Sequence, residues 1–194
     1  MNEDLTECFK HVRDSLNSAM AHYQIWFTLR GEGKAIKNYL NDMSDYRYVD
    51  FFHAANSGNY KLMFIETACL FDSDDRTQSI RNLKSLMNKY GLSNIADKFE
   101  NMLKPYAELV SNIKTIRSRV IAHKEADVDP SELYKKHGIK PDDIKDLLNL
   151  TAELLRELES NLTNNSSSHS VGATDRWERA TFNLLKSLKA GRSS

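Results

Sequence analysis

The sequence predicts an all-α protein, and three observations lead to this fold class. Glycine and proline are scarce, with 7 Gly and 3 Pro among 194 residues, whereas a chain of short strands needs a turn every ~8–12 residues. Apolar residues recur at three- and four-residue steps, the spacing of one helix face. Typical helix-start and helix-end residues flank these stretches. We therefore expect a helical bundle of about six or seven helices plus a tethered C-terminal helix.

Three patterned segments fill the first third of the chain. Gly31 and Gly33 are expected to end the first helix, because glycine commonly follows a helix C-terminus. Ser57 and Gly58 interrupt the third segment, which is therefore either one kinked helix or two helices. The expected helices occupy residues 3–30, 34–42 and 47–71.

An aspartate-rich loop follows the third segment. Asp72, Asp74 and Asp75 are suited to cap the next helix, because aspartate accepts hydrogen bonds from the free amides at a helix start. Three carboxylates in one loop also suit a divalent cation, but capping explains them with fewer assumptions.

Glycine, serine and proline mark the helix boundaries expected between the aspartate-rich loop and Lys124. Gly91 is expected to end one helix, and Ser93 to cap another. Pro105 either starts a new helix or kinks a continuous one, and the apolar stripe then runs to about Lys124.

The C-terminal third contains two proline-marked helix starts and a polar linker. Pro130 and Pro141 each stand where proline is favoured, at a first helical position. The last helix, from about Asp175, is amphipathic, and it is expected to dock either on the bundle or on a partner protein. The expected organisation is a helical domain at 1–163, a linker at 164–172 and a C-terminal helix and tail at 173–194.

Composition limits the functional classes. The chain has 27 Lys and Arg and 27 Asp and Glu, so a strongly basic nucleic-acid binder is not indicated, although a local basic patch is compatible with this balance. Cys8 and Cys69 lie in apolar helical patterns and are expected to be buried in a reducing compartment. We find no signal peptide, membrane-spanning segment, glycine-rich phosphate loop or metal-ligand spacing. A cytoplasmic protein without metal or cofactor is expected.

One histidine stands out because of its neighbours. His123 lies at the predicted end of a helix, and on an α-helix it falls within about 20° of the apolar stripe set by Ile116. Arg119 is then about 60° from that stripe on one side and Arg117 about 100° on the other. An imidazole exchanges protons near neutral pH, and a guanidinium clamps a phosphate. These groups are the minimum that metal-free RNA cleavage needs, although cations at a helix end also simply complement its dipole.

This segment resembles the signature of the HEPN superfamily, an arginine followed by four to six residues and then histidine. The wider pattern is similar to its AbiU-like abortive-infection branch, and the resemblance covers roughly residues 3 to 160. The stretches that carry this resemblance are Tyr23–Phe27, Leu70–Asp72, Asp74–Ile80 and Ile116–Lys124.

The resemblance implies a helical bundle that dimerises so that two Arg/His motifs face each other, and in active members a metal-independent endoribonuclease of toxin or phage-defence type. By position, Arg117 and His123 are the catalytic pair, and Ser118, Arg119 and Lys124 are candidates for RNA binding. Relatives often carry Asn, Asp or His where this chain has Ser118, and Arg119 is the closer neighbour of His123 on a straight helix. An antitoxin or other protein partner is compatible with such a role.

Three hypotheses therefore stand at this point. The first is a homodimeric ribonuclease. The second is an inactive HEPN-like module that holds a protein or binds RNA, and Ser118 and the tethered helix favour it. The third is a purely structural bundle in which Arg117 and Arg119 complement the helix dipole.

Overall fold

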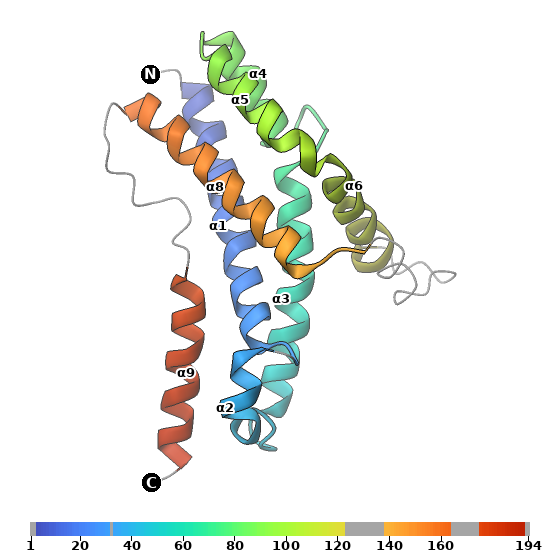
Figure 1. Cartoon of the computed structure of the whole chain (residues 1–194), viewed down its shortest axis with the longest axis vertical. Coiled ribbons are helices and arrows are strands. Elements are labelled where there is room, and N and C mark those ends of the chain that lie inside the picture. Colours follow the sequence, from blue (N-terminus) through green and yellow to red (C-terminus); the bar gives the residue numbers. More distant parts are fainter. Residues whose placement is uncertain (1–2, 32, 123–137, 164–174, 193–194) are drawn as a thin grey trace.

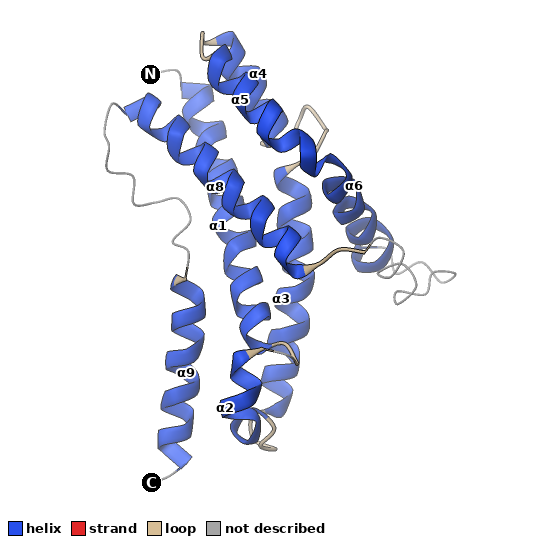
Figure 2. Cartoon of the chain, in the orientation of Figure 1, coloured by secondary structure: helices blue, strands red, loops and turns tan. Residues whose placement is uncertain are grey.

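A computed structural model gives the fold (Figure 1) and describes residues 3–31, 33–122, 138–163 and 175–192. Every regular element in these ranges is helical, and no strand occurs among them (Figure 2). The expected all-α bundle is thereby confirmed. The helices are α1 (Glu3–Leu29), α2 (Lys34–Met43), α3 (Val49–Leu70), α4 (Ile80–Lys89), α5 (Ser93–Leu103), α6 (Ala107–Ile116), α8 (Pro141–Thr163) and α9 (Arg176–Arg192).

The long helices α1 and α3 pack against each other along the middle of the molecule (Figure 1). α4 and α8 contact α1, α5 packs on α4 and α8, and α6 packs on α3. The main core draws on all of these helices. Its fully buried side chains include Leu16, Met63, Leu83, Phe99 and Leu155. Burying one such side chain contributes about 1.5–3 kcal/mol, so this interior is the main source of stability.

The helix boundaries settle two points that the sequence left open. α3 runs through Ser57 and Gly58 as one helix. Pro105 lies in a short 3₁₀ turn, Lys104–Tyr106, that joins α5 to α6. Proline has no amide hydrogen and clashes with the preceding helical turn, so the α-helical hydrogen-bond pattern changes at this point.

Two further boundaries have simple local causes. Gly91 follows the last turn of α4 with φ of +77°, a left-handed conformation that costs glycine little. Ser93 is the first residue of α5, and Leu92 occupies the cap position without a side-chain hydrogen bond. The expectation that Ser93 caps α5 is therefore wrong, because the cap position is one residue earlier, at Leu92.

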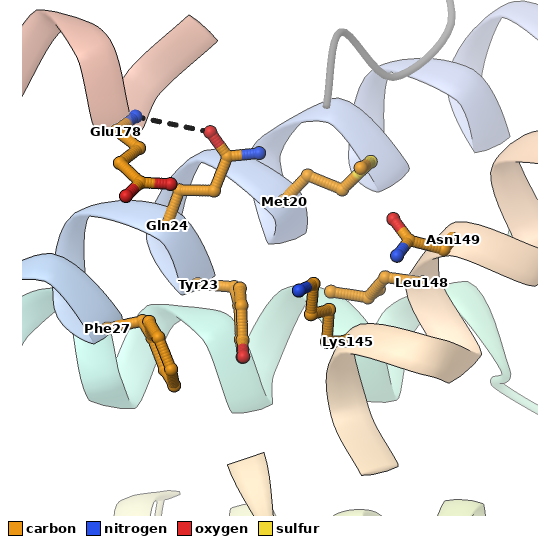
Figure 3. A pocket seen from close by; sticks show the side chains of 8 residues that line it. All are labelled: Met20, Tyr23, Gln24, Phe27, Lys145, Leu148, Asn149 and Glu178. Carbon is orange, nitrogen blue, oxygen red and sulfur yellow. Dashed lines mark hydrogen bonds between the residues drawn. The ribbon is translucent and has the colours of Figure 1, made fainter. Parts of the chain in front are cut away.

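The C-terminal helix α9 packs on α1 and α2. Gln24, a buried residue of α1, accepts hydrogen bonds through Oε1 from the backbone amides of Trp177 and Glu178, at 3.1 Å and 3.2 Å. Figure 3 shows the bond to Glu178. The buried side chains of a second, smaller core lie between α9, α2 and the adjoining ends of α1 and α3, and they are Leu29, Ala35, Met43, Phe52 and Leu185.

Some sequence expectations fall outside the described residues. The predicted helix start at Pro130 and the predicted linker at 164–172 are among them. Within the described part of the chain, no helix is both long and apolar enough to cross a membrane.

We predict that Gln24→Ala loosens α9. The substitution removes the acceptor for two amides in the first turn of α9, a loss comparable to that of a helix cap, which costs about 0.5–2 kcal/mol. Hydrogen exchange measured by mass spectrometry should speed up in α9 by roughly two- to thirtyfold. Gln78→Ala, at an exposed position, is the matched control. Unchanged exchange in α9 would show that these hydrogen bonds do not hold it.

Candidate functional site

The segment that carries the motif arginine is not α-helical. α6 ends at Ile116, and residues Arg117–Ala122 form a π-helix. A π-helix closes its hydrogen bonds between residues i and i+5, so each residue turns through a smaller angle than in an α-helix. The angular positions derived from α-helical geometry for Arg117 and Arg119 therefore do not apply. Short π-helical turns are frequent at functional sites.

Arg117 lines a pocket of about 200 Å³ where four parts of the chain meet. These parts are the last turn of α3, the loop that follows α3, the last turn of α6 and the first two residues of the π-helix. The lining residues are Ala68, Cys69, Asp72, Ser73, Lys114, Arg117 and Ser118. The pocket thus brings together two sequence stretches that are 45 residues apart, the aspartate-rich loop and the arginine motif.

The charges in this pocket suit an oxygen-rich anion. Lys114 and Arg117 are one helical turn apart, and both line the cavity. The hydroxyls of Ser73 and Ser118 supply further hydrogen-bond donors. Asp72 is the one carboxylate among the lining residues. An ammonium and a guanidinium beside two hydroxyls form a set of donors for phosphate oxygens.

The aspartate-rich loop is held by its own hydrogen bonds. Asp72 accepts a hydrogen bond through Oδ1 from the backbone amide of Asp74 at 3.0 Å. Asp74 accepts from the backbone amide and the guanidinium of Arg76, which lowers the pKa of the Asp74 carboxyl. Arg81 of α4 donates to the carbonyl oxygen of Ser73. These bonds fix the loop wall that carries Asp72 and Ser73.

The expected capping role of the aspartates is wrong. The cap position of α4 is Ser79, which makes no side-chain cap hydrogen bond, and the carboxylates of Asp72 and Asp74 bond to amides inside the loop. Asp75 instead pairs with Arg81 at 3.2 Å. Among the described residues, no group of three His, Cys, Asp or Glu side chains is arranged to hold a metal ion.

The other residues singled out by sequence differ in where they lie relative to this pocket. Ser118 is half-buried and lines the pocket, whereas Arg119 is exposed and does not line it. His123 and Lys124 lie outside the described residues. Cys8 is buried as expected.

The expected burial of Cys69 is wrong, because its side chain is exposed at the pocket. Partial burial and the nearby Glu66 raise the pKa of its thiol, and the positive charge of Arg117 opposes this rise. Sequence reasoning missed Cys69 and Ser73 as pocket residues, because nothing local in the sequence shows that the end of α3 and the end of α6 are adjacent.

A second pocket, also of about 200 Å³, lies between α1, α8 and α9 and shares no residue with the first. The rings of Tyr23 and Phe27 stack with centroids 5.4 Å apart (Figure 3), and burial raises the pKa of the Tyr23 phenol. Lys145 and Asn149 of α8 and Glu178 of α9 are at its edge. This pocket lies beside the contact of α9 with Gln24.

Comparison with known proteins gives one match. The model of the HEPN family described as AbiU2 matches residues 2–180, a range that runs from α1 into α9. The match continues beyond residue 160, where the resemblance of the sequence motifs ends. Neither the curated proteins nor the solved structures contain a significant match.

We predict that Arg117→Ala slows alkylation of Cys69. The thiolate is the reactive form, and removal of the nearby positive charge raises the thiol pKa, so less thiolate is present near neutral pH. Mass spectrometry of iodoacetamide-treated protein measures the rate at Cys69 separately from Cys8, whose thiol pKa burial raises to about 11. Arg119→Ala is the matched control. Equal rates in wild type and Arg117→Ala would contradict the placement of Arg117 beside Cys69.

Proposed function

Because this chain belongs to the AbiU2 family of HEPN proteins, we propose that it is a metal-independent endoribonuclease of toxin or phage-defence type that acts as a homodimer in the cytoplasm. The observation that supports this proposal most is the pocket in which Arg117 of the family motif meets Lys114, Ser118 and the fixed loop at Asp72. It offers two cations and two hydroxyls to a phosphate group on RNA.

In the proposed reaction the chain supplies charge and a proton carrier. Arg117, aided by Lys114, binds the scissile phosphate and stabilises the negative charge that grows on its oxygens. His123 removes the proton of the ribose 2′-hydroxyl, and the 2′-oxygen then attacks phosphorus. The bond between phosphorus and the 5′-oxygen breaks, leaving a 2′,3′-cyclic phosphate, and the departing 5′-oxygen takes up a proton. The second histidine of a dimer is a suitable donor of that proton.

The remaining motif residues are proposed to bind RNA. Ser118 lines the pocket and can donate a hydroxyl hydrogen bond to a phosphate oxygen. Arg119 is exposed near the pocket, and its charge suits a neighbouring phosphate. Lys124 follows His123 directly in the sequence and is assigned the same role.

The second candidate is an inactive HEPN module that binds RNA or a protein, such as an antitoxin, without cleaving RNA. Ser118 favours this alternative, because its hydroxyl cannot supply the charge that Asp or protonated His brings at this position. The two candidates differ in one measurable property, cleavage, and agree on the use of the Arg117 pocket.

We predict cleavage of tRNA or a structured mRNA by the purified protein with EDTA present. His123→Ala should lower the rate by roughly 10²–10⁴-fold, the usual range for loss of acid–base catalysis. Arg117→Ala should lower it by roughly 10²–10³-fold, as for loss of a group that stabilises negative charge in the transition state. Lys61→Ala, the loss of an exposed positive charge on α3 outside the pocket lining, should retain most of the activity. Full activity of His123→Ala would contradict the assignment, and an inactive wild type would favour the binding module.

We also predict that the protein is a dimer. One arginine and one histidine are a small catalytic set, and a two-fold axis doubles it with a self-complementary interface. Sedimentation velocity at micromolar concentration should give the mass of two 22.3 kDa chains. A single species with the mass of one chain over the same range would contradict the composite site.

A further inference from the structure

The charge of this chain is unevenly distributed. α9 contains five of the Lys and Arg residues and one Glu, a net charge of +4, so the rest of the chain holds 22 basic and 26 acidic residues and a net charge of −4. Overall neutrality therefore conceals a basic C-terminal helix on an acidic remainder. Separation of charge of this kind is typical of proteins that bind a polyanion.

The packing of α9 leaves its charged face outside. Its inner face contributes the buried side chains of Thr181 and Leu185 and the half-buried ring of Trp177. Its outer face is exposed, and the cationic residues of that face recur at intervals of three to seven positions along the helix. We call Arg176, Arg179, Lys186 and Lys189 the α9 basic face.

Two contacts of the α9 basic face leave its cations charged and exposed. Arg179 pairs with Asp175 at 3.2 Å with its side chain 69% exposed, and an ion pair this exposed holds its partners only weakly. The Lys189 ammonium lies 5.6 Å from the Tyr39 ring centroid, a contact that keeps its charge. The face therefore presents positive charge to the solvent.

Lys37 of α2 adds a second positive charge to a groove that Lys189 of α9 also lines. Lys189 of α9 and Lys37, Asn38 and Asn41 of α2 are among the residues that line an open groove of about 530 Å³. Asp42 also lines it, but its side chain is buried. A groove with two ammonium groups and two carboxamides matches the oxygens and edges of a nucleic-acid strand more closely than it matches an apolar ligand.

We infer that the α9 basic face and the adjoining α2 groove form an RNA-binding surface, separate from the Arg117 pocket, that holds the sugar–phosphate backbone of the substrate. RNA is named because the inference rests on the proposed ribonuclease function. A lipid surface fits less well, because a basic amphipathic helix binds membranes by inserting its apolar face. α9 packs most of that face, including Leu185, against α1 and α2 and leaves Leu184 exposed.

The test measures binding without cleavage. The probe is a fluorescent hairpin of 2′-O-methyl RNA, which lacks the nucleophilic 2′-hydroxyl, and its anisotropy is recorded over a range of salt concentrations. Lys37→Gln/Lys186→Gln removes two exposed charges from the surface, and Lys10→Gln/Lys61→Gln removes two exposed charges from α1 and α3. Circular dichroism verifies that both double variants are folded.

The surface variant should bind on the order of tenfold more weakly near physiological salt, and its salt dependence should fall by about 1.5–2 in slope, as expected for two lost phosphate contacts. The control variant should bind as wild type does. Equal affinities and slopes for all three proteins would overturn the inference. Binding to vesicles of phosphatidylserine and phosphatidylcholine, with no binding to the RNA, would overturn it in favour of a lipid surface.

The same experiment keeps this inference distinct from the proposed function. If RNA cleavage fails in every condition but the surface variant still loses RNA affinity, the binding surface stands and the ribonuclease does not. If cleavage is present and the surface variant changes neither KM nor binding, the ribonuclease stands and the surface does not.

Discussion

The rest of the structure depends on the burial of α1. Leu5, Leu16 and Leu29 are buried near its start, middle and end. A helix of 27 residues that buries apolar side chains over its whole length cannot be stable without several neighbours. Among the described helices, α2, α3, α4, α8 and α9 pack against it. The bundle is the set of elements that keeps these side chains from water, and the large apolar area they bury supplies the dominant favourable term of folding.

The same constraint positions the candidate site. Packing on α1 fixes α3, and the last turns of α3 carry Ala68 and Cys69 into the pocket. α6 packs on α3 in turn, so Lys114 and Arg117 face the loop that leaves α3. The site is assembled from rigid helix ends and a loop tied by its own hydrogen bonds, an arrangement that holds charged groups in place before a ligand arrives. The candidate RNA surface uses a different part of the same scaffold, at the far end of α1.

Sequence reasoning succeeded where the cause was local. Helices with one apolar stripe were found because periodicity is a property of a single segment, and Gly91 marked a helix end for the same reason.

Sequence reasoning failed where the cause lay elsewhere in the fold. The carboxylates of Asp72 and Asp74 could bond either to amides at the start of α4 or to amides within their own loop. The geometry of the folded loop, which spacing in the sequence does not show, decides for the loop amides. Cys69 was expected in the core, yet it lines the open pocket where the end of α3 meets the end of α6. Arg117 was found by its motif, but neither its π-helical setting nor its proximity to Asp72 follows from spacing. The contact of α9 with Gln24 joins residues more than 150 positions apart in the chain, so nothing local in the sequence indicates it.

The contact between Gln24 and α9 has an evolutionary consequence. Gln24 recognises backbone amides, which every residue except proline carries, so the side chains at positions 177 and 178 are free to change without loss of this contact. The requirement that this contact sets is therefore unequal for the two partners: it needs the glutamine side chain at position 24, whereas at positions 177 and 178 it excludes only proline. A lineage can thus vary the surface of its C-terminal helix, and with it the ligands that the surface selects, while the helix stays in its place on the bundle.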